Sequence, residues 1–206
     1  MITARFGDRL DAWVEAAVPF LFRLPINPNA ITVAGTAVSI VAGVAFAVGW
    51  FGWGAIGILI GGVFDLVDGV IARKQGTATA FGAFLDSTLD RIEEGVVLAA
   101  VATWFAKNSN DIAVGATVLT VIGSYMVSYT RARAEALGVE CKVGIASRAV
   151  RVVILSAGLL FAAGEIIPDF DLLEPAIYAM AALTIFTTFQ RVLHVRKQLA
   201  AAVPPV

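Results

Sequence analysis

Four aspartates at helical spacing stand out in an otherwise apolar part of the chain. Asp65 and Asp68 are three residues apart, and Asp86 and Asp90 are four residues apart. On helices, these spacings put both members of each pair on one face. If the two helices meet, four carboxylates share one small volume, and such a cluster needs cations to stay ionised. All-oxygen ligands favour hard ions such as Mg²⁺, Mn²⁺ or Ca²⁺, so these residues predict a divalent metal site.

The composition of the chain indicates an integral membrane protein. The 206 residues are 59% hydrophobic and only 15% charged, with a mean hydropathy of +0.84, whereas soluble domains average about 25% charged residues. Charges at membrane depth are costly and usually mark function, which strengthens the functional interpretation of the aspartates. The chain has one cysteine and one histidine, so a zinc site is not expected.

Apolar stretches near the ~20 residues that a membrane-spanning helix requires follow the first 27 residues. The six stretches are residues 31–50, 53–73, 82–105, 112–131, 150–166 and 175–194. Residues 1–27 have apolar side chains every three or four positions and predict an amphipathic helix in the interface plane. The expected fold is an all-α integral membrane protein: an N-terminal amphipathic interfacial helix with its linker (1–27), followed by a catalytic domain of six transmembrane helices (28–206).

The positions of the basic residues predict the orientation of these spans. With the N-terminus inside, Lys107 is the only one of the 15 Lys and Arg residues that falls outside. The positive-inside rule therefore puts both termini in the cytoplasm, and we expect a multi-pass protein of the cell membrane. Residues 65–73 end the second span, and residues 82–90 begin the third from the same, cytoplasmic side. A polar substrate then reaches the aspartates from water while a lipid tail stays in the bilayer.

Small residues recur every four positions on the first two spans. They are Gly35, Ser39 and Gly43 on the first span and Gly57 and Gly61 on the second. Such spacing lets helix backbones approach closely, so we interpret these residues as helix-packing positions without a catalytic role.

The register around the aspartates resembles a known family signature. The pattern D-x-x-D-G-x-x-A-R, eight residues, then G-x-x-x-D-x-x-x-D is similar to that of the CDP-alcohol phosphotransferases, also called CDP-alcohol phosphatidyltransferases. Its fixed positions are filled by Asp65, Asp68, Gly69, Ala72, Arg73, Gly82, Asp86 and Asp90. Chance Asp–Arg pairs at two polar helix ends would not explain this register. The resemblance implies transfer of a substituted phosphate from a CDP-linked lipid to an alcohol, with release of CMP.

The same resemblance implies roles for the four aspartates. Asp65, Asp68 and Asp86 match the family's ligands for Mg²⁺ or Mn²⁺, and Asp90 matches a position near the second of two ions. Asp90 also matches the candidate general base that receives the proton of the acceptor hydroxyl. Whether it acts as a base or chiefly as a ligand stays open. A homodimer is also implied, and no nucleic-acid partner is expected.

A second group of residues predicts the binding site of the CDP-lipid (CDP-diacylglycerol or a related CDP-lipid). Gly69 and Gly82 allow a nucleotide or a neighbouring helix to approach the backbone closely, and Arg73 offers a planar fork for phosphate or cytosine oxygens. The full predicted set is Asn29, Asp68, Gly69, Arg73, Thr77, Thr79 and Gly82. Asn29 has an alternative interpretation as the N-cap of the first span.

A cluster of arginines predicts that the acceptor alcohol carries a phosphate. The candidates are Arg131, Arg133, Arg148, Arg151 and Arg191. Residues 129–138 and 143–146 are similar to segments of the phosphatidylinositol-phosphate synthases and their archaeal archaetidyl counterparts. Those relatives often have acids where this chain has Ser147 and Val150, and a lysine where it has Arg131.

The leading hypothesis is a lipid synthase that transfers the phosphatidyl-type group to a phosphorylated polyol, inositol 1-phosphate. Within the same class, glycerol 3-phosphate is the alternative acceptor. A cation transporter that uses the carboxylates as its ion site is the alternative from another class. The position of the acids at one interface, and not at the midplane, argues against it.

Overall fold

The computed structural model describes residues 19, 27–164 and 166–202 of the chain. Within these residues the chain is helical and contains no strand, which confirms the all-α prediction. The helices are α2 (Pro28–Ala47), α3 (Phe51–Lys74), α4 (Ala80–Lys107), α5 (Asp111–Ala136), α6 (Arg148–Leu160), the short 3₁₀-helix η2 (Ala162–Gly164) and α7 (Leu173–Ala202). The amphipathic helix predicted within residues 1–27 lies outside the described residues, apart from Pro19 and Asn27.

Each predicted apolar stretch corresponds to one of the helices α2 to α7, but not every one of them meets the requirements of a membrane span. Among the described residues, α2, α3, α5 and α7 are long and apolar enough to cross a membrane. The fifth stretch forms α6, which has only 13 residues. Helix α4 is long but carries Asp86, Asp90, Arg91, Glu93 and Glu94 within three turns. Helix α6 therefore falls short in length, and α4 falls short because of its charged residues.

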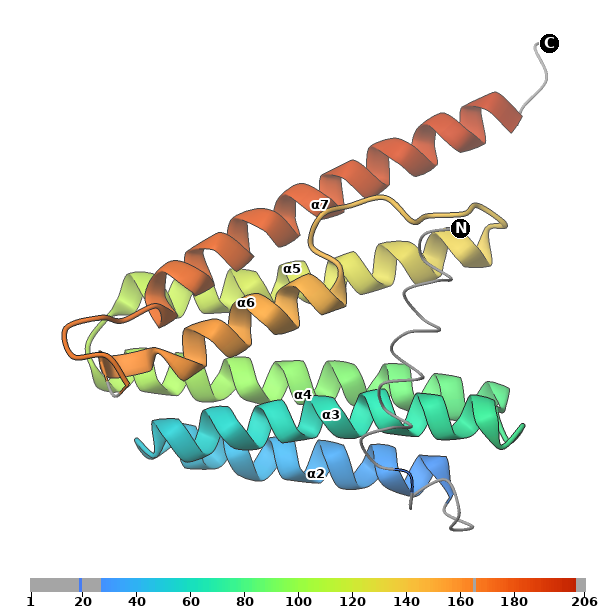
Figure 1. The fold of residues 1–206 in the computed structure, drawn as a ribbon. Helices are drawn as coiled ribbons and strands as arrows, with labels where there is room; N and C mark the ends of the chain where they lie inside the picture. Colours follow the sequence, from blue (N-terminus) through green and yellow to red (C-terminus); the bar gives the residue numbers. More distant parts are fainter. Residues whose placement is uncertain (1–18, 20–26, 165, 203–206) are drawn as a thin grey trace.

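The long helices lie alongside one another (Figure 1). The main packed pairs are α3–α2, α2–α4, α4–α5, α5–α7, α7–α6 and α6–α3. Taken in this order, the pairs form a closed ring of helices, in which α3 and α4 are both neighbours of α2. Helix α6 closes the ring because it packs against both α3 and α7.

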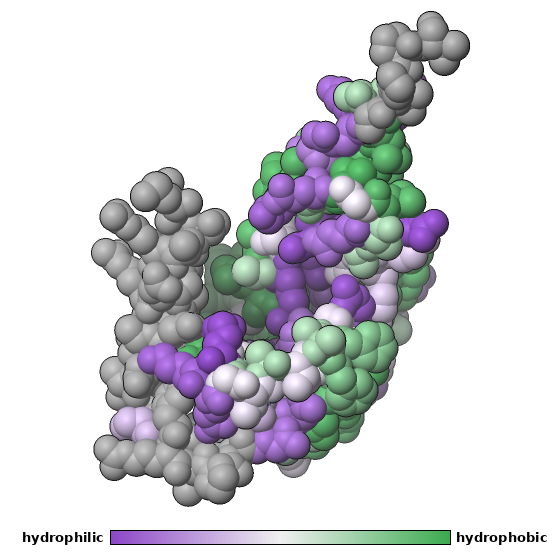
Figure 2. Space-filling model, turned by 90° about the vertical axis from the view of Figure 1, so that its right-hand side faces the viewer, coloured by the Kyte–Doolittle hydropathy of each residue, from purple (hydrophilic) through white to green (hydrophobic). Residues whose placement is uncertain are grey.

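The apolar core lies toward one end of this bundle, near the connections between α2 and α3, between α4 and α5, and between α6 and α7. Its fully buried members include Phe46, Leu98, Leu159, Leu173 and Ile177. Toward the opposite end, a smaller cluster around Ile71 is buried between α2 and α3. Figure 2 views this opposite end, where hydrophilic residues gather around a hollow. The helices therefore pack tightly at one end and leave room for a polar site at the other.

Small residues allow α2 and α3 to approach closely. A Cβ atom added to Gly61 would lie 1.8 Å from Ser39 Oγ, and one added to Gly57 would lie 2.6 Å from the Cβ of Ala42. Gly35 is equally restricted by α3. The interpretation of these glycines as packing positions is confirmed. Because α3 carries the first aspartate pair, this packing also sets the position of the pair relative to α2.

Outside the apolar core, the distribution of apolar and charged residues differs from that in a soluble bundle. Large apolar side chains are exposed on the outside, among them Val41, Trp53, Ile112, Val153 and Phe189. Charged side chains are buried inside, among them Asp68, Glu93, Arg151 and Arg191. Such an arrangement suits a bundle surrounded by lipid, where intramembrane charges face the interior and pair with one another.

Candidate functional site

The first aspartate pair lies in the last three turns of α3. Asp68 is buried, and its Oδ2 accepts a hydrogen bond from the hydroxyl of Thr32 on α2. Asp65, one turn earlier, points toward α6, where its Oδ2 accepts a hydrogen bond of 2.8 Å from Arg148. Oδ1 of Asp65 is buried and has no hydrogen-bond partner. The two carboxylates are thus held by different neighbouring helices.

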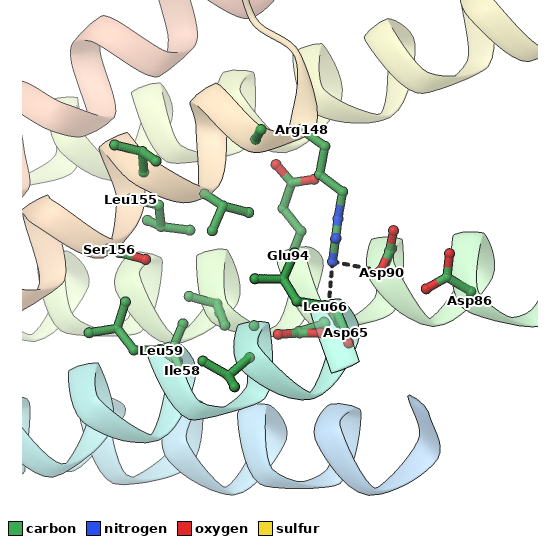
Figure 3. A pocket seen from close by; sticks show the side chains of 17 residues that line it. Ile58, Leu59, Asp65, Leu66, Asp86, Asp90, Glu94, Arg148, Leu155 and Ser156 are labelled. Carbon is green, nitrogen blue, oxygen red and sulfur yellow. Dashed lines mark hydrogen bonds and ion pairs between the residues drawn. The ribbon is translucent and has the colours of Figure 1, made fainter. Parts of the chain in front are cut away.

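The second aspartate pair lies near the start of α4 and meets the first pair through an arginine. A guanidinium nitrogen of Arg148, the first residue of α6, lies 2.6 Å from Oδ1 of Asp90 and 2.8 Å from Oδ2 of Asp65. Figure 3 shows this arginine reaching down from α6 between the two aspartates, with Asp86 one turn along α4 from Asp90. Arg148 therefore links α6 to both α3 and α4.

Three neighbouring cavities surround the aspartates. The first, which we call the glycine cavity, has a volume of about 310 Å³ and lies where α2, α3 and the start of α4 meet. All seven residues predicted to bind the CDP-lipid line it: Asn29, Asp68, Gly69, Arg73, Thr77, Thr79 and Gly82. Asp65 and Asp86 form its boundary with the rest of the site.

Two residues of the glycine cavity have additional structural roles. Thr79 caps α4, since its hydroxyl accepts a hydrogen bond of 3.0 Å from the backbone N–H of Gly82. The N-cap of α2 is Asn27, whose side chain accepts a hydrogen bond from the N–H of Asn29. The alternative interpretation of Asn29 as the cap was therefore wrong, because the helix begins two residues earlier than that interpretation requires. A Cβ atom on Gly82 would lie 3.0 Å from Oδ1 of Asn29, so this glycine keeps the cavity open.

The second cavity, which we call the apolar cavity, has a volume of about 550 Å³ and lies between α3, α4 and α6. Figure 3 shows its apolar walls, which include Ile58, Leu59 and Leu155, extending from the charged end. The charged end is formed by Asp65, Asp86, Asp90, Glu93, Glu94 and Arg148. An amphiphile with a charged head and an apolar tail matches this lining.

The third cavity, the arginine cavity, has a volume of about 340 Å³ and lies between α4, α5, α6 and α7. Four of the five arginines predicted for the acceptor phosphate line it: Arg131, Arg148, Arg151 and Arg191. Arg133 is exposed and lines none of the three cavities. Asp90 also borders the arginine cavity, so the aspartates stand where all three cavities meet.

The arginines of this cavity differ in what they contact. Arg191 donates from Nε to the carbonyl of Val143 at 2.9 Å and from a second nitrogen to the carbonyl of Val127. Arg151 forms a two-point ion pair with Glu94 at 2.6 and 2.7 Å. Arg131 pairs with Glu135 on its own helix at 2.9 Å, and both side chains are half exposed. The cavity thus combines buried, tightly held arginines with a more accessible one.

Several residues of the site were missed by the interpretation of the sequence. Glu93 is buried beside Asp90 and accepts a hydrogen bond of 2.5 Å from Ser39. Glu94 follows Asp90 by four residues, so extending the i,i+4 spacing along α4 would have found it. No comparable signal marks Thr32, a single hydroxyl residue in an apolar helix. Its contact with Asp68 depends on the packing of α2 against α3.

The donor set suits a divalent cation, although the side chains are not grouped around one point. Among the described residues, no three His, Cys, Asp or Glu side chains form a ready metal site. The aspartates nevertheless offer only oxygen atoms, and Oδ1 of Asp65 is buried without a donor. Buried carboxylate oxygens are normally paired, so this atom fits a hard cation as its partner.

Comparison with known proteins adds independent information on this arrangement. The pattern of the CDP-alcohol phosphatidyltransferase family matches residues 25–190. The chain is 39% identical over 181 residues to an archaetidylinositol phosphate synthase of Methanothermobacter thermautotrophicus, covering 88% of this chain and 89% of that protein. It is 36% identical over 182 residues to a phosphatidylinositol phosphate synthase of Mycobacteroides abscessus, covering 85% and 80% of the two chains.

Solved structures show the same fold. The chain resembles crystal structures of the phosphatidylinositol phosphate synthase of Mycobacterium tuberculosis at 30% sequence identity. For the structure with CDP-DAG bound, the TM-score is 0.80, and 88% of this chain and 92% of that chain are covered. For the complex with manganese and citrate, the TM-score is 0.81, and 88% of each chain is covered. The resemblance found in the aspartate signature is confirmed, and the protein is a transferase that belongs to the CDP-alcohol phosphatidyltransferase family.

Proposed function

We propose that this transferase makes a phosphatidylinositol phosphate or its archaeal analogue. It would transfer the phosphatidyl-type group of CDP-diacylglycerol, or of a related CDP-lipid, to inositol 1-phosphate and release CMP. The observation that carries the proposal is the meeting of three cavities at the aspartates: one lined by Gly69 and Arg73, one apolar, and one lined by arginines. The names of relatives at 36–39% identity support the same reaction.

Each cavity has a lining that suits a different part of the two substrates. The cytidine and its phosphates suit the glycine cavity, where the backbone is accessible and Arg73 supplies charge-assisted hydrogen bonds. The lipid tails suit the apolar cavity. The phosphate of the acceptor suits the arginine cavity, with Arg148 and Arg191 as its leading ligands and Arg131 and Arg151 as further candidates.

The reaction would occur where the three cavities meet. The acceptor hydroxyl attacks the phosphorus that carries the lipid, the bond from that phosphorus to the oxygen of CMP breaks, and CMP leaves. Asp90 borders the arginine cavity and is our candidate to take the hydroxyl proton. Asp65, Asp68, Asp86 and Asp90 would hold Mg²⁺ or Mn²⁺, two ions in our proposal, which would neutralise the phosphates and the departing CMP. Arg148, between Asp65 and Asp90, would be well placed to orient an incoming phosphate.

We further propose that all six helices α2 to α7 cross the cell membrane, with both termini and the site on the cytoplasmic side, and that the protein is a homodimer. Helices α4 and α6 would then be spans whose charges face the interior of the bundle. Single cysteines placed at Ser109 and at Thr77, in a variant whose Cys141 is replaced by alanine, test the orientation. An impermeant thiol reagent added to intact cells should label the first position and not the second. The reverse labelling would contradict the proposed topology.

An assay with labelled acceptors tests the proposed reaction. Purified protein in mixed micelles with CDP-diacylglycerol and Mg²⁺ would receive inositol 1-phosphate, glycerol 3-phosphate, free inositol or serine. We expect lipid product and CMP with inositol 1-phosphate at a rate far above the other three. Preference for glycerol 3-phosphate would change the acceptor but keep the reaction class. Equal use of free inositol would contradict the role of the arginine cavity. A parallel assay with an ether-linked CDP-lipid would decide which lipid is preferred.

A further inference from the structure

Helix α2 carries three buried hydroxyl side chains on one face, although it contributes none of the signature residues. Thr32, Thr36 and Ser39 follow one another at intervals of four and three residues, and each is at most 5% exposed. The first donates to Oδ2 of Asp68 on α3, and the last donates to Oε1 of Glu93 on α4 at 2.5 Å. Both of these hydroxyls thus hold an acid of a neighbouring helix.

The middle hydroxyl and one carboxylate oxygen of α3 are both buried without a partner. Oγ1 of Thr36 makes no hydrogen bond with any residue that the structure describes, and the same is true of Oδ1 of Asp65. The side chain of this aspartate is only 7% exposed, so bulk water does not take the place of a partner. Since buried polar groups are normally hydrogen-bonded, an unpaired donor and an unpaired acceptor in one protein suggest a match.

The register of α2 against α3 brings these two groups to the same level. The two helices run in opposite directions, and Ser39 lies against Gly61. The contact between the first hydroxyl of α2 and Asp68 lies seven positions earlier on α2 and seven positions later on α3. Thr36 falls between these two contact points on α2, and Asp65 falls between them on α3. The unpaired donor therefore faces the turn of α3 that carries the unpaired acceptor.

We propose that Thr36 is a positioning residue for Asp65. Its hydroxyl donates to Oδ1 and fixes the orientation of the carboxylate, as the hydroxyl of Thr32 does for Asp68. A carboxylate offers about four lone-pair sites, so Oδ1 accepts this hydrogen bond and keeps a lone pair for a divalent cation. The inference rests on the proposed function, because that function assigns a cation to the aspartates. It gives α2 a role in the site, which is to support both aspartates of α3.

The affinity for Mn²⁺ is the quantity that this role changes. Loss of a hydrogen bond to a metal-ligating carboxylate typically lowers metal affinity by 10- to 100-fold. Thr36→Val keeps the shape of the side chain and removes the hydroxyl, so the Kd for Mn²⁺ should rise by about tenfold or more. Thr36→Ser keeps the hydroxyl and should have a Kd close to that of the unsubstituted protein. Thr32→Val should raise the Kd in the same way, because it removes the bond to Asp68.

The experiment is a titration of Mn²⁺ into the purified full chain in detergent, with free Mn²⁺ measured by electron paramagnetic resonance. Thr117→Val is the matched control. This threonine of α5 is as buried as Thr36, but its hydroxyl donates to a carbonyl of its own helix, that of Ala113, at 2.7 Å. The control should leave the Kd for Mn²⁺ unchanged.

The thermal midpoint without added cation separates positioning from a purely structural role. If the hydroxyl of Thr36 served only the packing of α2, Thr36→Val would lower the midpoint and leave the Kd for Mn²⁺ unchanged, and this result would overturn the inference. A valine fills nearly the same volume and buries no hydroxyl. We therefore expect an unchanged or higher midpoint together with the raised Kd.

Asp65→Asn distinguishes failure of this inference from failure of the proposed function. If Asp65→Asn does not weaken Mn²⁺ binding, the proposed cation site is wrong, and the role of Thr36 is overturned with it. If Asp65→Asn weakens binding and Thr36→Val does not, the cation site stands and only the role of Thr36 is overturned. Added to Asp65→Asn, Thr36→Val should cause little further loss, because Thr36 acts through this carboxylate. A further tenfold loss in the double variant would contradict that route.

Discussion

At the scale of single residues, the site is defined by carboxylates whose partners differ. Asp68 is bound by Thr32, and Asp65 and Asp90 share Arg148. Asp86 differs from these three, because its carboxylate makes no hydrogen bond or ion pair with another residue that the structure describes. It faces both the glycine cavity and the apolar cavity. Its replacement therefore tests the proposed cation site without removing a partner of Arg148.

We predict that Asp86→Asn lowers the rate of CMP release by at least ~10²-fold, because a transition state rich in phosphate charge loses part of its electrostatic stabilisation. The variant should elute from size-exclusion chromatography like the unsubstituted protein. Asp111→Asn, at the far end of the bundle on α5, is the control and should retain activity. Full turnover by Asp86→Asn with Mg²⁺ present would contradict the assignment.

Arg73 tests the division of substrates between cavities. It lines the glycine cavity but not the arginine cavity. Arg73→Ala should therefore raise the KM for the CDP-lipid by about tenfold or more, since charge-assisted hydrogen bonds to phosphate are worth about 1.5–3 kcal/mol. The KM for the acceptor should change less. Lys74→Ala, which removes the neighbouring cation outside the cavity, serves as the control. If Arg73→Ala raises the KM for the acceptor more than the KM for the CDP-lipid, the two cavities have been assigned to the wrong substrates.

At the scale of the elements, the position of α3 depends on its close packing against α2. Gly61 faces Ser39, which in turn holds Glu93 on α4. One tight contact thus involves three helices at once. Since Glu93 lines the charged end of the apolar cavity, helix packing and the geometry of the site are coupled at this point.

We predict that Gly61→Ala destabilises the protein, because the added Cβ would lie 1.8 Å from Ser39 Oγ and 3.2 Å from the carbonyl oxygen of Gly35, so that Ser39 or the helices must shift. Overpacking of this kind costs about 1–3 kcal/mol, which should lower the thermal midpoint measured in detergent. Gly62→Ala is the matched control, since a Cβ there meets nothing within 4 Å. An equal midpoint for both variants would show that α2 and α3 do not pack as described.

At the scale of the whole molecule, the two ends of the bundle have different roles. The tightly packed apolar end stabilises the fold, and the hollow polar end holds the candidate site. The core at one end holds the bundle together, while the three cavities occupy the part where the helices leave space (Figure 2). Ligands that fill these cavities add contacts between helices that otherwise meet through a few side chains. Binding should therefore be visible as stabilisation of the entire fold.

We predict that CDP raises the thermal midpoint in detergent when Mg²⁺ or Mn²⁺ is present and does not do so after treatment with EDTA. A ligand at 100 times its Kd stabilises the folded state by about 2.7 kcal/mol. EDTA should also abolish CMP release, and added Mg²⁺ should restore it. Uridine diphosphate is the control for recognition of the base. Stabilisation by CDP without any divalent ion would contradict the proposed cation site. The same measurement tests the alternative of a cation transporter, because such a protein would have no reason to bind CDP.

Much of this architecture follows from local patterns in the amino-acid sequence. The apolar stretches predicted the position of each helix, because a helix that is buried in lipid or in a core requires a run of mostly apolar residues. The spacing of Asp65, Asp68, Asp86 and Asp90 predicted a shared site, and the Gly69–Arg73 register with Thr77 and Thr79 predicted one wall of a cavity. These residues are close in sequence, so helix periodicity and one short loop are enough to bring them together.

Only the tertiary structure decided which distant side chains pair. Arg148 reaches Asp65 across 83 positions of sequence, and Arg151 reaches Glu94 across 57. The sequence predicted a cluster of arginines for the acceptor, but Arg133 is exposed and Arg151 is bound by a carboxylate. Composition and spacing determined that this protein has a membrane-type helical fold and an aspartate site. Which charge meets which depends on how α6 packs between α3 and α7, and no local pattern encodes that packing.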